Sequence, residues 1–382
     1  MDNKIHIVCF DIPYPPSYGG AIDVYYRIKS LHDLGVRITL HCYHKEQKNN
    51  LSALEELCEK VYYYPRKTSL WQQFHWTPYE VVSRMHPDLL PRLLQDNHPI
   101  LFEGLVSCAL LAHPALQNRK KLFRECNVEH DYYRELGKAS TNLLVKGFYF
   151  IESIRLKYFE PCVQHADAIL ALAHQDEKHF HTHYPSVPTY YIPCFHAYEH
   201  ISTRPGIGQP YILYHGNLSV SENQKAALYI LRHLAPHIPH QIIIAGHNPF
   251  DTLRREIKKH PNVTLIESPD SQTMEQLIRD AQVHLLITFQ ATGIKLKLLN
   301  VLYTGKHVVV NPEMLVGTEL SGLCHVGHSD EELVNLCSSL MQQSIGQNAI
   351  EERQAILDSC YNNRKSAQQI VTILSGSRGS DK

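Results

Sequence analysis

Two lysines and a glycine follow an apolar run near the C-terminal third of the chain, and their chemistry suits a diphosphate. The segment 292–300 reads Thr-Gly-Ile-Lys-Leu-Lys-Leu-Leu-Asn and opens a helix-like stretch. Free backbone amides, the helix dipole and the ammonium groups of Lys295 and Lys297 would all favour negative charge at that helix start. The alternative is that both lysines are solvated surface charges.

Two further segments place small or polar residues between an apolar run and a helix. Gly19 and Gly20 precede the first helix-like stretch, where amides without a nearby Cβ can approach an anion closely. This segment is neither GxGxxG nor a Walker loop, so we do not expect NAD or ATP. A tight turn without a ligand is the alternative.

The second of these segments follows the apolar run 211–215 and carries His215, Gly216, Asn217 and, shortly behind, Asn223. These residues suit an anion or sugar contact at the start of a helix. The alternative is a simple helix cap in which Ser219 or Ser221 serves only the backbone.

Carboxylates and imidazoles gather after another apolar run, at 124–133. Asn127, Glu129 and His130 suit proton transfer or hydroxyl recognition, with local caps and surface pairs as the alternative. Glu103 closes the short apolar run 100–103, and we expect it to line a binding cleft.

A histidine-rich segment at 179–183 does not predict a metal site. Only His179 and His183 would share a helix face, and no third ligand is evident.

The elements that position these residues alternate between strand-like and helix-like, which is typical of parallel α/β sheets. In the first half the predicted strands are 5–10, 36–42, 61–64, 100–103, 121–125 and 168–172. In the second half they are 211–215, 241–245, 263–266, 283–287 and 307–310. We therefore expect two tandem Rossmann-like domains that face each other across a cleft, with ligands at the carboxyl ends of their strands.

The predicted boundaries follow proline and glycine. The first domain is 1–195, a linker rich in these residues is 196–210, and the second domain is 211–349. A helix is expected at 350–374, crossing back to the first domain, and a disordered tail at 375–382.

Composition excludes several classes of protein. The 37 basic and 38 acidic residues give a net charge of −1, which argues against a strongly basic, nucleic-acid-coating protein. No apolar run approaches the roughly 18 residues of a membrane-spanning helix, and the N-terminal run is too short for a signal peptide. Because no cysteine pair is spaced CxxC, zinc knuckles are not expected, and a cytoplasmic location is predicted.

The chain resembles GT-B glycosyltransferases of family 4, the group 1 type, especially bacterial, Bacteroidetes-like members. The resemblance spans nearly the whole chain and rests on residues 13–20, 215–223, 244–246 and 293–310. It implies retaining, metal-independent transfer of a hexosyl group from a nucleoside diphosphate sugar to a glycan or lipid-linked acceptor, as in polysaccharide biosynthesis. No cofactor is expected besides the donor substrate.

The resemblance also implies roles for individual residues. The donor would bind mainly to the second domain and the acceptor to the first. Donor contacts are implied for Gly19, Gly20, His215, Gly216, Asn217, Asn223, Gly246, Thr292, Gly293, Ile294 and Asn300. Catalytic roles are implied for Asn127, Glu129, His130, Lys295 and Lys297, and an acceptor contact for Glu103.

Two departures from the family pattern leave other functions open. The family's two glutamates, eight positions apart, fall on Thr292 and Asn300, and its basic pair is replaced by Asn217 and Asn223. A catalytically silent nucleotide-sugar-binding subunit and a GT-B nucleotide-sugar epimerase are the alternatives. A lipid-linked acceptor would bring the chain to a membrane surface, but the sequence shows no amphipathic basic helix strong enough to establish this.

Overall fold

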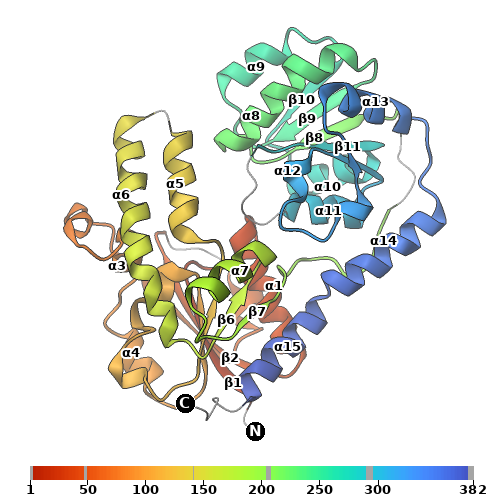
Figure 1. Cartoon of the computed structure of the whole chain (residues 1–382). Helices are drawn as coiled ribbons and strands as arrows, with labels where there is room; N and C mark the ends of the chain where they lie inside the picture. Colours follow the sequence, from red (N-terminus) through yellow and green to blue (C-terminus); the bar gives the residue numbers. More distant parts are fainter. Residues whose placement is uncertain (1–2, 47–49, 141, 204–207, 290–295, 377–382) are drawn as a thin grey trace. The chain divides into compact units, whose positions relative to one another are not determined.

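The computed structural model describes residues 3–46, 50–140, 142–203, 208–289 and 296–376. The chain divides into two compact units (Figure 1). Unit 1 comprises Met1–Ala197 and Tyr361–Lys382, and unit 2 comprises Tyr198–Cys360. Each unit is built on a parallel sheet, so the predicted pair of α/β domains is confirmed.

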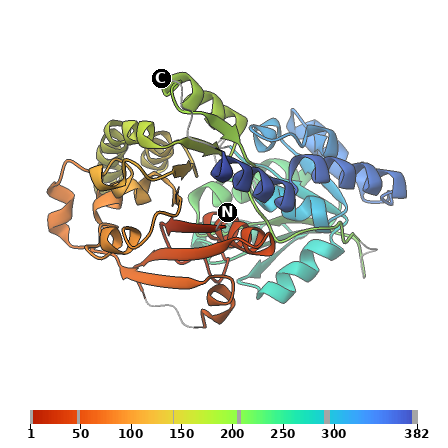
Figure 2. The same ribbon diagram turned by 90° about the horizontal axis from the view of Figure 1, so that it is seen from below.

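Unit 1 contains seven parallel strands among its described residues, in the order β3-β2-β1-β4-β5-β6-β7. Figure 2 views the chain from below, with the first strands of this sheet side by side in red and orange. The strands are β1 (Lys4–Cys9), β2 (Arg37–His44), β3 (Lys60–Pro65), β4 (Ile100–Glu103), β5 (Lys121–Arg124), β6 (Ala168–Ala171) and β7 (Thr189–Tyr191). The α-helices are α1 (Gly19–Asp33), α2 (Ser52–Glu55), α3 (Tyr79–Val82), α4 (Leu89–Leu93), α5 (Glu129–Ala139), α6 (Leu143–Phe159), α7 (His174–His183) and α15 (Asn363–Ser375). Short 3₁₀ turns are η1 (Leu70–Phe74), η2 (Leu105–Leu110), η3 (Pro114–Leu116) and η4 (Glu160–His165).

The sheet of unit 1 is buried on both faces. Successive residues of β1 alternate between two separate apolar clusters, because strand side chains point to opposite faces. Ile7 and Cys9 join α1 in one cluster, whereas Val8 joins the other with Phe102 and Phe123. This explains why β1 reads as a continuous apolar run.

The last helix, α15, packs against α1 in unit 1. Ala367 and Ile370 are fully buried in the cluster that contains Val24 and Ile28. Where the sequence predicts one helix at 350–374, the structure has α14 (Gln347–Cys360) and α15. The break occurs because Asn362 caps α15, its side chain accepting a hydrogen bond from the Lys365 amide.

Unit 2 contains six parallel strands among its described residues, in the order β10-β9-β8-β11-β12-β13. They are β8 (Ile212–His215), β9 (Ile242–Gly246), β10 (Val263–Glu267), β11 (Val283–Leu286), β12 (His307–Val310) and β13 (His325–Val326). The helices around them are α8 (Ser221–Tyr229), the π-helical η5 (Ile230–Leu234), the 3₁₀ turns η6 (Ala235–His237) and η7 (Ser321–Leu323), α9 (Asp251–Ile257), α10 (Ser271–Asp280), α11 (Leu296–Thr304), α12 (Pro312–Leu315), α13 (Asp330–Leu340) and α14.

The edge strands β7 and β13 were not among the predicted strands. β7 has three residues inside a proline-rich segment, and β13 has two, so neither produces an apolar run. The helices α5 and α6 pack against each other as a hairpin. α6 begins at Leu143, where the Asn142 side chain caps it, and ends at Phe159. Within the described ranges, no helix has the length and apolar character needed to cross a membrane.

Candidate functional site

In unit 2 the carboxyl end of the central strand β8 carries a buried histidine. His215 is the last residue of β8 and only 6% exposed, and neither ring nitrogen has a hydrogen-bond partner among the described residues. Burial, with a further contribution from the Lys297 ammonium, lowers the pKa of His215 to about 3. The ring is therefore neutral and retains an unused donor and acceptor.

Beside His215, one chain of hydrogen bonds connects the start of α11, the start of α8 and the turn after β8. The Lys297 ammonium, in the first turn of α11, donates to Asn223 Oδ1 at 3.2 Å. Asn223 Nδ2, in the first turn of α8, donates to the Asn217 carbonyl at 3.0 Å. Asn217 Oδ1 accepts from the amide and hydroxyl of Ser219, which closes the turn after β8. The structure thus brings together three predicted donor contacts, His215, Asn217 and Asn223, and the predicted catalytic Lys297.

The turn after β8 depends on a glycine from the neighbouring strand. A Cβ built on Gly246, at the end of β9, would lie 1.9 Å from the Gly216 carbonyl oxygen. Backbone therefore contacts backbone here, and only glycine permits this approach.

We expect Gly246→Ala to lower the free energy of unfolding by about 1–3 kcal/mol, because the added methyl overpacks this contact. Urea unfolding is the measurement, and Gly322→Ala is the matched control, since nothing lies within 4 Å of its added Cβ. Equal effects of the two substitutions would show that the contact is not tight.

Glu222, in the first turn of α8, is a residue that the sequence analysis did not single out. Its carboxylate accepts from the Thr288 hydroxyl and the Phe289 amide, both at 2.7 Å. Asn311, after β12, also donates to the Thr288 carbonyl at 2.6 Å. These bonds tie α8 and β12 to the chain leaving β11, and only the fold brings them together.

Thr292, Gly293, Ile294 and Lys295 lie outside the described residues. Asn300 lies on α11, half-buried, and its side-chain oxygen is 3.2 Å from the Thr304 hydroxyl one turn later. Lys297 is therefore the residue of the predicted segment 292–300 that, among the described residues, joins the hydrogen bonds beside His215.

In unit 1, Gly19 and Gly20 form the first turn of α1. The residue before them, Tyr18, makes no side-chain cap and instead donates its hydroxyl to Asp11 at 2.8 Å. A Cβ on Gly20 would lie 3.0 Å from the Phe10 ring, so glycine allows the helix start to pack on that ring. The first turn carries no acidic residue.

Glu129 is an acid with an unusual environment at the start of α5. It is 8% exposed, and it makes no hydrogen bond through its side chain to a described residue. Burial raises the pKa of Glu129 to about 7, even though the nearby Arg84 guanidinium partly offsets that rise. A carboxyl with this pKa can accept or donate a proton near neutral pH.

His130, the next residue, faces a different group. Its Nδ1 lies 2.9 Å from Glu160 Oε2, and the other Glu160 oxygen accepts from His179 and the Tyr184 hydroxyl. Burial by itself would raise the pKa of Glu160. The hydrogen bonds and charges of His130 and His179 outweigh burial and lower this pKa to about 2. His130 is thus held in an internal network, and the half-buried Asn127 lies in the turn before α5.

Glu103 is not at a surface. Its side chain is fully buried and paired with Arg27, which also pairs with Asp23. Asp23 in turn binds Arg124 and the Phe195 amide. The expectation that Glu103 lines a cleft is therefore corrected, because its carboxylate closes an ion network between α1, β4 and β5.

We expect Glu103→Gln to destabilise the protein by about 3–5 kcal/mol, because it leaves the buried network of Arg27, Arg124 and Asp23 with one positive charge uncompensated. Glu59→Gln, which removes an exposed partner of Lys4, is the control and is expected to cost about 1 kcal/mol or less. Urea unfolding at neutral pH distinguishes them. A small effect at Glu103 would mean that water reaches the network.

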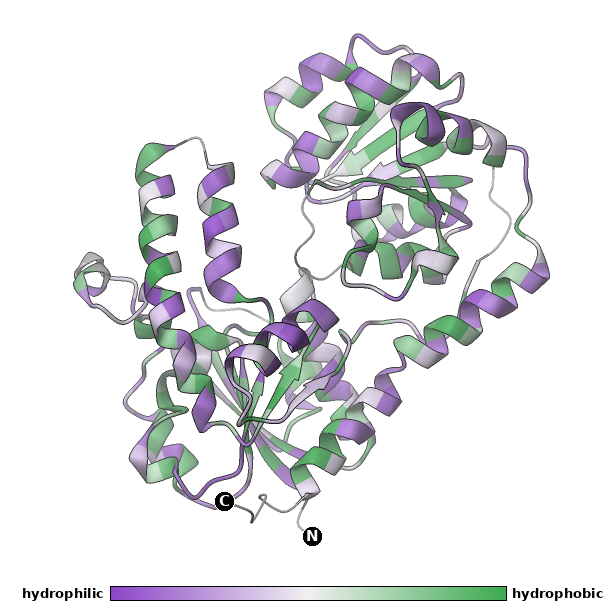
Figure 3. Ribbon diagram, in the orientation of Figure 1, coloured by the Kyte–Doolittle hydropathy of each residue, from purple (hydrophilic) through white to green (hydrophobic). Residues whose placement is uncertain are grey.

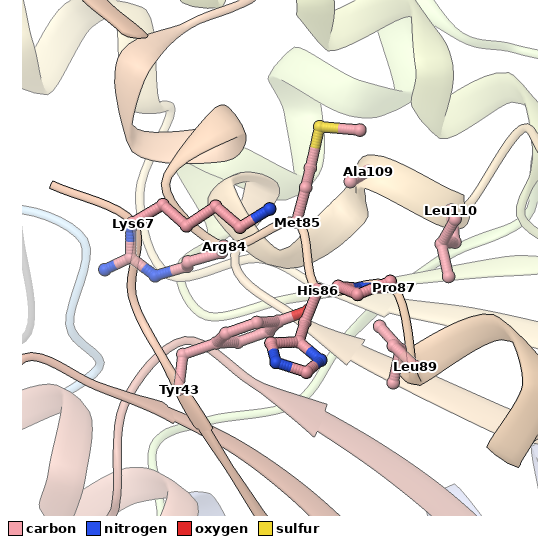
Figure 4. Close-up of a pocket in the computed structure, with 9 residues that line it drawn as sticks. All are labelled: Tyr43, Lys67, Arg84, Met85, His86, Pro87, Leu89, Ala109 and Leu110. Carbon is pink, nitrogen blue, oxygen red and sulfur yellow. The ribbon is translucent and has the colours of Figure 1, made fainter. Parts of the chain in front are cut away.

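A pocket of about 290 Å³ opens in unit 1, near Glu129's neighbour Arg84 (Figure 4). Its lining is mainly apolar. The residues are Tyr43, Lys67, Arg84, Met85, His86, Pro87, Leu89, Ala109 and Leu110. In Figure 4 the cationic side chains of Lys67 and Arg84 lie on one side and the side chains of Leu89 and Leu110 on the other. No spacing pattern indicated this site, because four separate segments build it.

On α7 the ring centroids of His179 and His183 lie 4.4 Å apart. His179 binds Glu160, and His183 Nδ1 bonds the His179 carbonyl at 2.9 Å. In the described parts of the chain, no group of three His, Cys, Asp or Glu side chains is placed to hold a metal ion.

Comparison with known proteins establishes the fold. No family model matches the chain. A protein of Klebsiella pneumoniae, described as an uncharacterized 44.6 kDa protein in the cps region, is 25% identical over 339 residues, covering 84% of this chain and 85% of that protein.

Three solved structures share the architecture over nearly the whole chain. TarM of S. aureus, solved with UDP, has a TM-score of 0.67 at 9% identity and covers 98% of this chain and 100% of its own. HepE of Anabaena, solved with UDP and glucose, has a TM-score of 0.65 at 13% identity, covering 97% and 99%. Sucrose-phosphate synthase of Thermosynechococcus elongatus has a TM-score of 0.64 at 13% identity, covering 97% of each chain. The fold is GT-B.

Proposed function

We propose that this protein is a glycosyltransferase that moves a hexosyl group from a nucleoside diphosphate sugar to a glycan or lipid-linked acceptor. The observation that carries the proposal is the cluster at the end of β8. There the Lys297 ammonium, linked to Asn223, lies near a neutral His215 with unused hydrogen-bonding capacity. A cation with polar groups at the carboxyl edge of a parallel sheet suits a diphosphate.

We assign the donor to unit 2. Lys297 would offset the negative charge that develops on the departing nucleoside diphosphate, and this is the main catalytic contribution we expect from unit 2. Gly216 would let the backbone approach the nucleotide, Gly246 would hold the turn that carries Gly216, and Asn217 would supply a polar contact. The UDP complexes of HepE and TarM support a nucleotide-sugar donor. Thr292, Gly293, Ile294, Lys295 and Asn300 stay in the proposed donor site on the family resemblance.

We assign the acceptor to unit 1. The apolar pocket beside Arg84 would hold part of the acceptor, and Glu129 would take the proton of its hydroxyl. Gly19 and Gly20 would contact the donor phosphates through the amides of α1. The resemblance to family 4 supports retention of configuration without a metal ion, in the setting of polysaccharide biosynthesis.

A catalytically silent nucleotide-sugar-binding subunit is the second candidate. Asn300 favours it, because this residue stands where the family has a glutamate and its side-chain oxygen contacts Thr304 in its own helix. A neutral amide binds a ribose hydroxyl more weakly than a carboxylate does.

Turnover separates the two candidates. The full chain is incubated with UDP-, GDP-, ADP- and dTDP-hexoses, with and without EDTA, and released nucleoside diphosphate is measured. The proposal predicts release from one donor, unchanged by EDTA and accelerated by extracts containing glycan or lipid acceptors. Binding of a nucleoside diphosphate without any release would instead identify a silent subunit.

A further inference from the structure

Helix α6 has an apolar stripe that faces solvent. Leu143 and Leu144 are 82% and 86% exposed, and Tyr158, at the other end, is 68% exposed. From Leu144 the exposed small and apolar positions recur at 147, 151, 154 and 158, the alternating three- and four-residue spacing of one helix face. With successive residues about 100° apart, the stripe covers about 100° of the helix and contains no charged residue.

The opposite face of α6 packs against the rest of unit 1. Glu152, Ser153 and Leu156 are buried against the rest of unit 1, and α5 packs along α6. Figure 1 shows the two helices as a hairpin extending from the sheet of unit 1. In Figure 3, α6 is mostly hydrophobic, whereas α5 is mostly hydrophilic. The outer stripe of α6 is therefore an additional apolar surface.

A second segment extends this surface with aromatic rings. Trp71, Phe74 and Trp76 are 80%, 81% and 70% exposed, which is rare for such large apolar side chains. The ring centroids of Trp76 and Tyr158 are 5.8 Å apart, so the segment around η1 adjoins the stripe. We call the stripe of α6 and these three aromatic residues the apolar face.

The residues that flank the apolar face are basic. Lys146 and Lys157 lie on one side of the stripe by helical position, and Arg155, on the other side, is 15% exposed and lies 3.6 Å from the Glu152 carboxylate. Glu152 is the acidic residue of α6 and is fully buried, and the segment 68–78 carries no acidic residue. A surface of this composition is complementary to an apolar layer with a negatively charged border.

We propose that the apolar face docks on the surface of an anionic lipid bilayer. Tryptophan and tyrosine favour the boundary between headgroups and acyl chains, leucine and isoleucine enter it, and the lysines reach the phosphates. A second copy of the chain fits less well, because a symmetric contact would place the basic flanks of both copies together. This inference is independent of the proposed function, since no residue of the apolar face belongs to the donor or acceptor site.

Tryptophan fluorescence reads this contact directly, because the chain has two tryptophans and both lie in the apolar face. The full chain is titrated with vesicles of equimolar phosphatidylethanolamine and phosphatidylglycerol, and separately with phosphatidylcholine vesicles. We expect co-sedimentation and a blue shift of the emission with the anionic vesicles, both weakened by added salt. Absence of binding to the anionic vesicles would overturn the proposal.

Paired variants locate the contact. Ile151→Ser with Ile154→Ser is expected to weaken vesicle binding by about tenfold or more. Lys146→Gln with Lys157→Gln should weaken it by about fivefold per lysine. Leu94→Ser with Val316→Ser alters exposed apolar residues outside the face and should change nothing. Because all these side chains are at least partly exposed, melting midpoints should match that of the unchanged chain.

Two results would contradict the proposal even if vesicles bind. Binding that survives the Ile151 and Ile154 substitutions would place the contact elsewhere. A blue shift that appears with protein concentration alone, together with a doubled mass in sedimentation, would make the face an interface between copies. Nucleoside diphosphate binding, measured without lipid, tests the proposed function separately.

Discussion

Replacing Glu129 with glutamine is expected to lower the rate of sugar transfer by about 10²–10⁴-fold, the usual contribution of a positioned acid or base. Glutamine keeps the size of the side chain but cannot take up the proton of an acceptor hydroxyl. Donor binding should be unchanged, because the donor is assigned to unit 2. The measurement is kcat together with the Kd for the nucleoside diphosphate.

Glu129→Gln is expected to lower activity but to raise the free energy of unfolding at high pH. The pKa of Glu129 is about 7 in the folded chain, above its ordinary value of 4.5. The folded chain therefore holds a proton between these values that the unfolded chain has lost, and stability falls as the pH rises from about 4.5 to 7. Over that window the loss is about 3 kcal/mol. Glu129→Gln should remove it, and the variant should be the more stable protein at pH 8.

Glu135→Gln is the matched control, since Glu135 lies on the same helix and pairs with the exposed Lys138. It should leave both activity and the pH dependence of unfolding unchanged. A Glu129→Gln variant that is less stable at every pH, with activity lost in proportion, would show that Glu129 serves only the fold.

Lys297→Met is expected to weaken nucleoside diphosphate binding by about 10- to 100-fold. A hydrogen bond to a charged group contributes about 1.5–3 kcal/mol, and methionine retains the length of the side chain without its charge. Calorimetric titration with the preferred nucleotide is the measurement.

Lys258→Met is the control for Lys297, because Lys258 is exposed on the same unit beyond α9. It should bind nucleotide as the unchanged chain does. Equal affinities of the two variants would remove Lys297 from the donor site.

The parallel sheets could be predicted because their strands are buried on both faces. The run 5–10 and the run 307–310 are almost wholly apolar, and such runs require cover on each side. The alternation of these apolar runs with helix-like stretches, on both sides of the predicted linker 196–210, then indicated two α/β units. β7 and β13 escaped prediction because their residues are few and only partly buried.

The candidate site could be predicted only where its residues are close in sequence. His215, Asn217 and Asn223 lie within one strand-turn-helix segment, so their meeting follows from local structure. Arg84 and Glu129 are 45 positions apart and become neighbours only through the fold. Glu103 was placed at a cleft because the sequence pattern of a carboxylate ending an apolar strand is the same in two cases. The carboxylate can face solvent, or it can pair with a buried arginine, as it does here with Arg27.

The outer stripe of α6 could not be recognised from periodicity. Its exposed residues, such as Leu144 and Ile151, alternate with inward-facing ones, such as Leu156, so apolar residues surround much of the helix. A hydrophobic period is visible only when one face is polar. The three-dimensional packing was needed to show which face remains exposed.

Thermal unfolding with UDP, GDP, ADP, CMP and dTDP, each with and without magnesium, tests whether unit 2 binds a nucleoside diphosphate at Lys297. A ligand that binds only the folded chain raises its stability by RT ln(1 + [L]/Kd). We expect one nucleoside diphosphate to stabilise the protein without magnesium, Lys297→Met to reduce the shift in line with its weaker binding, and Lys258→Met to preserve it. No stabilisation by any nucleotide, or a shift that Lys297→Met leaves intact, would contradict the proposed donor site.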